Sequence, residues 1–263
     1  MLTSDEIIAE VNFLTQSPVR FQILELLYEE RDLTQSELNE RMDVSRVTVQ
    51  RNVQALEERD WIDNSHPTYS ITPLGELVIE DVEPLAESLT LTRKLRPFLK
   101  WLPRGAFDLD PRHLTDATIL PVDPTDPYNW VSYHMERLSS VSRVRMTLPM
   151  IGDEALDVLS ERVLADELEA ESVADPEVAR TLRTNPRYTG TVEELLGTDR
   201  FELYVYEGRL SYGVGVFDKF VQMIVADDEG MPQALVETES EVVRDWAADR
   251  IEYHRDRAEP FDL

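Results

Sequence analysis

The sequence has no cysteine, and it has only four histidines, three lysines and nine glycines among its 263 residues. Without cysteine, disulfide bridges and thiolate chemistry are excluded. No apolar run is long enough to span a bilayer, and the first residues lack the basic start that an export signal needs. We therefore expect a cytoplasmic protein that does not associate with membranes.

The few histidines and glycines also argue against catalysis. A hydrolase of the phospholipase D type needs a histidine nucleophile with a lysine two residues later, and none of the four histidines has one (His66, His113, His134 and His254). Gly213 and Gly215 lie in a strand pattern without the helix that a phosphate loop requires. His134 and Glu136 diverge on a helix, so we expect no metal site and no cofactor. A phosphodiester hydrolase stays the least supported alternative.

Acidic residues outnumber basic residues along the whole chain. There are 53 Asp and Glu against 26 Lys and Arg, which gives a net charge of −27, and residues 1–72 alone carry 14 acidic residues and six arginines. Acidic composition with little lysine is typical of proteins from salt-in halophiles, and we infer such a source. In molar salt the Debye length is only ~3 Å. A nucleic acid would then be held by short-range hydrogen bonds, not by long-range attraction.

Residues 17–72 contain the clearest succession of local structural signals. Ser17 and Pro18 predict the cap and first position of a helix. Thr34 and Glu37 form the pattern of a capping box, which predicts a second, short helix. Ser45 begins a third helix, over residues 45–59. Its apolar residues recur at helical spacing and predict one buried stripe, consisting of Val49, Val53 and Leu56.

The opposite side of the third helix carries side chains that can read DNA. We predict that this side and the helix start contact DNA through Ser45, Arg46, Val47, Gln50, Arg51 and Gln54. The helices that begin at Thr34 and Ser45 form a helix-turn-helix pattern. In this motif the second of the two helices, here residues 45–59, lies in the major groove with its N-terminal residues at the base edges. Arginine reads guanine through two hydrogen bonds, and glutamine can read adenine in the same way.

Two short strands, Trp61-Ile62 and Tyr69–Ile71, flank a turn that predicts a wing with Asn64, Ser65 and His66. The segments SPVRFQILELL, LTQSELNERMDVSRVTVQRNVQALEERDWI and YSITPLGELV resemble the winged helix-turn-helix transcriptional regulators of archaea. The chain departs from that family at Asp60, where glycine is usual, although Asp tolerates the left-handed conformation. The wing also lacks Arg and Lys. A winged helix that binds proteins instead of double-stranded DNA is the main alternative.

Residues 73–103 predict a helical linker. Leu74, Leu77, Leu85 and Leu89 recur at helical spacing, while Pro84 and Pro97 predict a kink or a break. Such a helix can pair two subunits, and a twofold dimer places two recognition helices about one DNA turn apart. We therefore expect a homodimer, with simple packing of this helix on the first domain as the alternative.

Residues 104–263 predict a mixed α/β domain, so that the whole chain is α+β with domains 1–72, 73–103 and 104–263. Short β-rich runs at 117–120, 143–148 and 168–173 alternate with helical patterns at 127–140, 153–164, 176–184 and 191–196. Four further strands, at 201–206, 211–217, 220–225 and 233–237, predict an antiparallel meander, and residues 239–257 predict a closing helix.

Nearly the full length resembles haloarchaeal and methanogen regulators that join a winged helix to a C-terminal domain of the methanogenesis-regulator type. The segments LTDATILPVDPTDP, RVRMTLPM and YGVGVFDKFVQMIVADDEGMPQALVETESEVVRDWA carry this resemblance. It implies a sensing or dimerising C-terminal domain, similar to a degenerate phospholipase-D-like fold, and no particular ligand. A candidate pocket for an unknown small-molecule effector comprises Tyr204, Tyr206, Tyr212, Gly213, Gly215 and Asp218, with packing and turn formation as the alternative.

Overall fold

The computed structural model describes residues 3–65, 67–123, 125–126 and 128–263, and the chain forms two compact units that divide between Thr90 and Leu91. The division falls inside the predicted linker range, 73–103, and the helix α5 (Pro73–Leu99) runs across it. The α+β fold class is confirmed. No helix of the described residues is both long and apolar enough to cross a bilayer.

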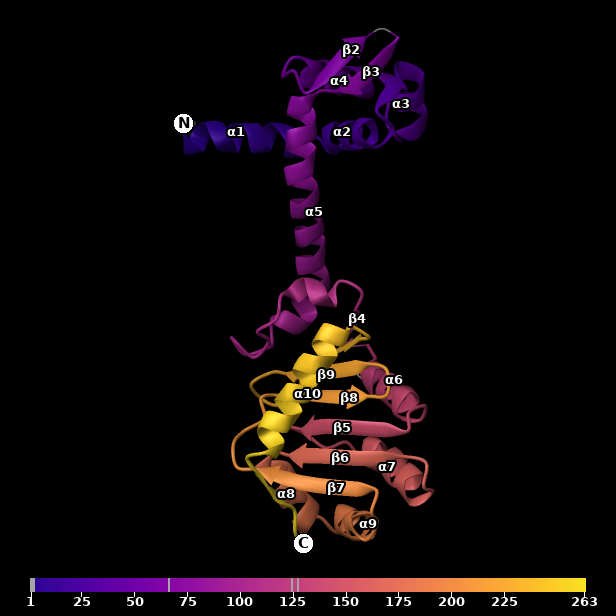
Figure 1. The fold of residues 1–263 in the computed structure, drawn as a ribbon, viewed down its shortest axis with the longest axis vertical. Coiled ribbons are helices and arrows are strands. Elements are labelled where there is room, and N and C mark those ends of the chain that lie inside the picture. Colours follow the sequence, from indigo (N-terminus) through magenta and orange to yellow (C-terminus); the bar gives the residue numbers. More distant parts are fainter. Residues whose placement is uncertain (1–2, 66, 124, 127) are drawn as a thin grey trace. The chain divides into compact units, whose positions relative to one another are not determined.

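The first unit is a winged helix, as predicted (Figure 1). Its helices before α5 are α1 (Ser4–Thr15), α2 (Pro18–Glu30), α3 (Gln35–Arg41) and α4 (Arg46–Glu57). β2 (Ile62–Ser65) and β3 (Thr68–Ile71) form the predicted antiparallel hairpin. β3 also pairs with β1 (Asp32–Thr34), a strand outside the prediction. The buried faces of these elements form one core, which includes Ile23, Leu24 and Leu27 of α2.

Local chemistry at the ends of the helices agrees with the sequence in three places. Thr34 and Glu37 form the predicted capping box, with the Thr34 backbone N–H donating to Glu37 at 2.7 Å. Asp60 adopts a φ of 56°, so it does take the left-handed conformation. Ser17 takes the predicted N-cap position ahead of Pro18, and its hydroxyl donates to Asn52 of α4 at 3.0 Å instead of making a capping bond.

The start of α5 lies directly against the hairpin because Gly75 has no side chain. A Cβ at Gly75 would lie 2.1 Å from the backbone carbonyl oxygen of Trp61. The helix then continues through Pro84 and Pro97 without interruption, so the predicted break does not occur. Ile79 is buried in the first core, whereas Leu85 and Leu89 on another side of the helix are exposed.

The second unit contains an eight-stranded mixed sheet in the order β11-β7-β6-β5-β8-β9-β10-β4 (Figure 1). The strands are β4 (Thr118–Pro121), β5 (Arg143–Leu148), β6 (Glu169–Ala174), β7 (Phe201–Tyr206), β8 (Tyr212–Phe217), β9 (Val221–Ala226), β10 (Pro232–Thr238) and β11 (Ala258–Pro260). β8, β9 and β10 form the predicted meander. The placement of β7 in that meander is wrong, because β7 pairs parallel with β6 and is separated from β8 by two strands.

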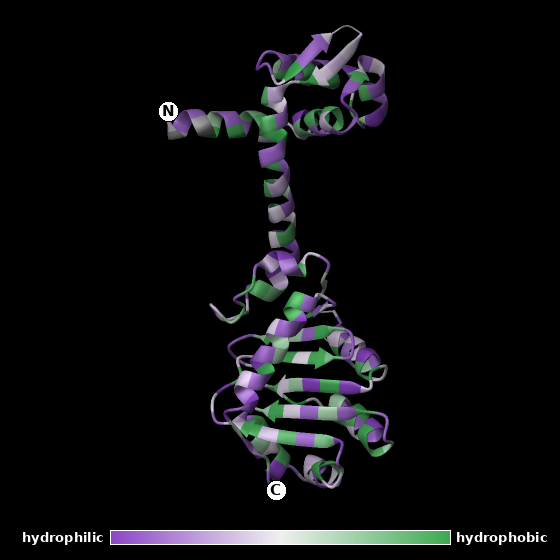
Figure 2. Ribbon diagram, in the orientation of Figure 1, coloured by the Kyte–Doolittle hydropathy of each residue, from purple (hydrophilic) through white to green (hydrophobic). Residues whose placement is uncertain are grey.

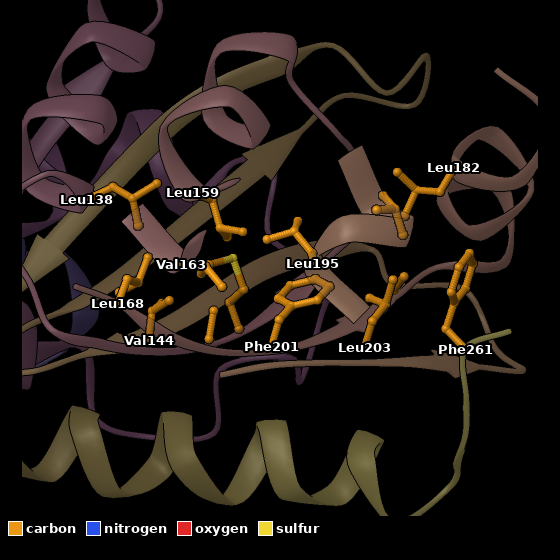
Figure 3. Close-up of a cluster of buried hydrophobic side chains, with 14 of the residues drawn as sticks. Leu138, Val144, Leu159, Val163, Leu168, Leu182, Leu195, Phe201, Leu203 and Phe261 are labelled. Carbon is orange, nitrogen blue, oxygen red and sulfur yellow. The ribbon is translucent and has the colours of Figure 1, made fainter. Parts of the chain in front are cut away.

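Helices cover both faces of this sheet and enclose two apolar cores. One core involves α6 (Asn129–Leu138), α7 (Asp153–Leu164), α8 (Pro176–Thr184) and α9 (Pro186–Leu196). The other involves α10 (Glu241–Arg255), the end of α5 and the short 3-10 helix η1 (Pro111–Leu114). Figure 3 shows the first core on one side of the strands and α10 on the other. Asp175 and Asn185 cap α8 and α9 ahead of prolines, and α9 therefore begins at Pro186, before the predicted range of 191–196.

Candidate nucleic-acid interface

The helix α4 is positioned by its first residue and by one buried face. The Ser45 hydroxyl accepts the backbone N–H of Thr48 at 3.2 Å, so Ser45 is an N-cap. The predicted stripe of Val49, Val53 and Leu56 is buried in the core of the first unit. Together these contacts fix the orientation of α4, with the side opposite the buried stripe facing solvent.

A fourth buried residue of α4, Asn52, was missed by the sequence-based reasoning. Asn52 is only 1% exposed. Its amide oxygen accepts a hydrogen bond from the Ser17 hydroxyl at 3.0 Å, and its amide nitrogen donates to the Thr48 carbonyl at 2.8 Å. The helical spacing of Asn52 from Val49 and Leu56 already places it toward the buried face. Asn52 therefore links α4 to the start of α2 and holds the orientation of the helix.

The side chains predicted to read DNA are exposed on the remaining surface of α4. Val47 is 75% exposed, and Arg46, Gln50, Arg51 and Gln54 are also exposed. Gln54 donates to Glu58 at 3.3 Å, which engages it near the end of the helix. Within the described part of the chain, the guanidinium groups of Arg46 and Arg51 have no hydrogen-bond or ion-pair partner. Their donors are therefore available to an external acceptor.

Positive charge gathers beside α4 despite the acidic composition of the chain. Burial lowers the pKa of Arg20, and the charges of Arg59 and Arg51 lower it further. The guanidinium of Arg20 lies 4.0 Å from the ring centroid of Phe13, and that of Arg59 lies 3.3 Å from it. Sequence reasoning missed Arg20 and Arg59, because they come from α2 and from the segment after α4 and converge only in the fold.

The described residues of the wing include no Arg or Lys. Asn64 and Ser65 are exposed, and the Ser65 hydroxyl donates to the Asp63 carboxylate at 2.9 Å. The third predicted wing residue, His66, lies outside the described residues. Asp63 would repel a phosphate, so this geometry favours contact through α4 over contact through the wing.

Two family comparisons match the two parts of the chain. Residues 8–94 match the HVO_A0261 N-terminal domain, and residues 127–257 match the middle domain of the methanogenesis regulatory protein FilR1. The chain belongs to the archaeal transcriptional regulators with a FilR1-type middle domain. No curated protein matches it.

Solved structures resemble this regulator only distantly. The archaeal chromatin protein TrmBL2 is 12% identical with a TM-score of 0.44, over 90% of this chain and 91% of that chain. NucT from Helicobacter pylori is 13% identical with a TM-score of 0.45, over 55% of this chain and 98% of that chain. Nuc from Salmonella typhimurium, a phospholipase D family member, is 9% identical with a TM-score of 0.44, over 56% and 99%.

The FilR1-type domain separates the six residues that the sequence groups as a candidate pocket. Tyr204 and Tyr206 lie on β7, where Tyr204 donates to Glu202 and the Tyr206 ring contacts His254. Tyr212 lies on β8 and donates to the Ala106 carbonyl at 3.3 Å. The Asp218 carboxylate accepts the backbone N–H groups of Ser142 and Arg143, each at 2.8 Å. Gly213 and Gly215 line one cavity that the other four residues do not line, so the predicted grouping as one cluster is wrong.

Proposed function

We propose that this regulator binds specific promoter sequences in double-stranded DNA, with α4 in the major groove. The observation that carries the proposal is the pair of exposed, unpaired guanidinium groups of Arg46 and Arg51 on a helix whose other face is fixed in a core. Arginine forks recognise guanine at close range, so they remain effective where salt screens long-range attraction. Arg20 offsets part of the local acidic charge, whereas Arg59 is paired with Glu10 at 3.2 Å.

We also propose that the protein binds DNA as a homodimer. Apolar side chains remain exposed on α1 and on the part of α5 within the first unit, and green segments recur along both helices in Figure 2. They include Ile8, Val11, Leu74, Leu77, Leu85 and Leu89. On α5 the four leucines span about 120° of the helix circumference at 100° per residue. A second subunit would cover this stripe and set two recognition helices about one DNA turn apart.

We infer that the chain acts without catalysis. None of its histidines has the lysine that a phospholipase-D-type site needs. Among the described residues, no three His, Asp or Glu side chains gather as a metal site would require. The second unit then has a regulatory role, and its effector is an unknown small molecule.

The test of DNA reading compares wild type with an Arg46→Ala/Arg51→Ala variant by chromatin immunoprecipitation and by fluorescence anisotropy on the recovered sequence. Loss of each bidentate contact should weaken specific binding by ~1–3 kcal/mol, while the salt dependence stays nearly constant. Arg112→Ala/Arg180→Ala, which removes two exposed arginines of the second unit, is the charge-matched control. A recovered motif that both proteins bind equally would refute the role of α4, and no motif at all would indicate a protein-interaction module.

The dimer is tested by sedimentation of a Leu85→Glu/Leu89→Glu variant. We expect a dimer for wild type and a monomer for this variant, because each carboxylate would be buried at the interface without a partner. Leu164→Glu, at an exposed leucine of the second unit, should stay dimeric. A dimer that survives both charges on α5 would exclude this stripe as the interface.

A further inference from the structure

The second unit contains a cavity of about 580 Å³ on the face of the sheet that α6–α9 cover. α6, the segment 149–152, the start of α7 and strands β5, β6, β8 and β9 contribute to its wall. Its lining is mainly apolar, with side chains such as Met135, Leu138, Met146, Leu156 and Ile224. This volume lies within the range of roughly 300–1,000 Å³ that small-molecule sites occupy.

The charges around the cavity disfavour an anion. Among the lining residues that the structure describes there is no Lys or Arg, and the acidic ones are Asp153 and Glu154 at the start of α7. The nearby cation Arg137 is paired with the buried Glu237 at 2.6 Å. Asp153 is itself paired with Arg187 at 2.6 Å, and a charge of either sign is costly to bury against a mainly apolar wall. A ligand that fills the space should therefore be uncharged.

One polar side chain of the wall, His134, has a fixed hydrogen-bonding role. Its Nδ1 lies 2.6 Å from the amide oxygen of Gln222, whose amide nitrogen donates to Glu237 at 2.8 Å. A carboxylate only accepts, so Gln222 must turn its NH₂ toward Glu237 and its oxygen toward the histidine. Burial lowers the pKa of His134, which keeps the ring neutral. The proton is then on Nδ1, and Nε2 is an acceptor that has no partner among the described residues.

A second polar group lies at the other side of the same wall. Ser172 on β6 is fully buried, and its hydroxyl has no hydrogen-bond partner. The sheet register places Ser172 opposite Met146, Met146 opposite Gly215, and Gly215 opposite Gln222. With about 4.8 Å between strands, the row from Ser172 to Gln222 extends roughly 14 Å. The floor of the cavity is thus long, apolar in the middle and polar near both ends.

We propose that this cavity binds an uncharged, elongated and mostly apolar small molecule whose terminal hydroxyl or N–H group donates a hydrogen bond to Nε2 of His134. The buried hydroxyl of Ser172 can accept or donate at the far end. The inference rests on the second unit alone and does not depend on DNA binding.

The proposal is tested by calorimetric titration of the full chain with 1-decanol, decyl methyl ether and decanoate. The alcohol can donate to His134, the ether cannot, and the carboxylate is anionic at pH 8. We expect saturable 1:1 binding of decanol, binding of the ether weaker by about fivefold, as one lost hydrogen bond predicts, and decanoate weaker still. Absence of saturable decanol binding would overturn the proposal.

Two variants locate the site. Gly152→Trp should reduce decanol binding at least tenfold by filling part of the cavity that Gly152 lines, since Gly152 has extended backbone and a Cβ there would have its nearest neighbour at 3.9 Å. Val242→Trp, on an exposed position of α10, is the matched control and should bind as wild type does. His134→Phe should remove the preference for the alcohol over the ether. Unchanged binding in Gly152→Trp, or a preference that persists in His134→Phe, would refute the assignment.

Discussion

The buried amide of Asn52 gives the most direct test of how α4 is held. Asn52→Ala removes two hydrogen bonds, one accepted from Ser17 at 3.0 Å and one donated to the Thr48 carbonyl at 2.8 Å. A net intramolecular hydrogen bond contributes about 0.5–1.5 kcal/mol. Ser17 is only half-buried, so its hydroxyl can be rehydrated in the variant. We therefore expect a loss of roughly 1–3 kcal/mol in the stability of the first unit.

The measurement is urea unfolding with hydrogen exchange resolved to α2 and α4. In a thermal unfolding experiment on the same variant, each kcal/mol of lost stability would lower the Tm by roughly 4–8 °C for a unit of about 90 residues. Asn64→Ala, the same substitution at an exposed wing position, is the control and should change stability by less than about 0.5 kcal/mol. A double-mutant cycle of Ser17→Ala with Asn52→Ala should give a coupling energy of about 1 kcal/mol.

The reasoning would be refuted by either of two results. Equal stability of the Asn52 and Asn64 variants would mean that the buried amide contributes nothing net. A coupling energy near zero would mean that Ser17 does not hold α4, even if Asn52 stabilises the helix in another way. Specific DNA affinity should decrease together with stability, because the link orients the helix that carries Arg46 and Arg51.

Two further predictions concern the packing of α5 and the pH dependence of the second unit. Gly75→Ala should destabilise the first unit by about 1–3 kcal/mol or more, because its Cβ would lie 2.1 Å from the Trp61 carbonyl oxygen. Gly190→Ala in α9, where a Cβ would have no neighbour within 4 Å beyond its own stretch of helix, should be neutral or stabilising by up to ~1 kcal/mol in the same urea assay. Burial lowers the pKa of His134 in the folded protein, so on acidification the unfolded chain binds the proton first. The stability of the second unit should therefore fall as the pH drops below about 6.5, by at most ~1.4 kcal/mol per pH unit for this residue. His134→Gln should reduce this dependence of stability on pH without abolishing it, since burial also lowers the pKa of His254. An unchanged pH dependence would show that His134 is protonated in the folded protein.

The elements that sequence predicted well are those that local chemistry determines. The predicted bounds of α7, α8 and β7 are those of the structure. Asp175 precedes a proline and accepts a backbone N–H group at the start of α8, which requires no distant partner. The outward side of α4 follows from the period of its apolar residues alone. The exposure of the predicted DNA-reading residues could therefore be obtained before any tertiary structure was known.

The errors arise where a partner far along the chain decides the outcome. β1 and β11 have three residues each, too few for a pattern, and they exist because β3 and β7 pair with them. β7 precedes β8 by a short turn, which favours a hairpin, yet β6 and β5 lie between them. Sequence thus grouped Tyr204 and Tyr206 with Tyr212, although the sheet keeps them apart. Turn residues determine that the chain reverses but not which strand it joins next.

The candidate ligand site depends on the same non-local information. Its floor is a row of paired residues from four adjacent strands, Ser172, Met146, Gly215 and Gln222. A shift of one residue in the pairing of any of these strands would turn the residue in this row toward the face of the sheet that α10 covers. The His134 ring is oriented by Gln222, which in turn is oriented by Glu237 on a fifth strand. Each of these residues is unremarkable in sequence, since a lone serine, glutamine or histidine in an apolar stretch is usually a satisfied core residue. Only the strand register shows that they line the same cavity. The function of a polar residue in a buried strand can therefore be inferred only after the strand order of the sheet is known.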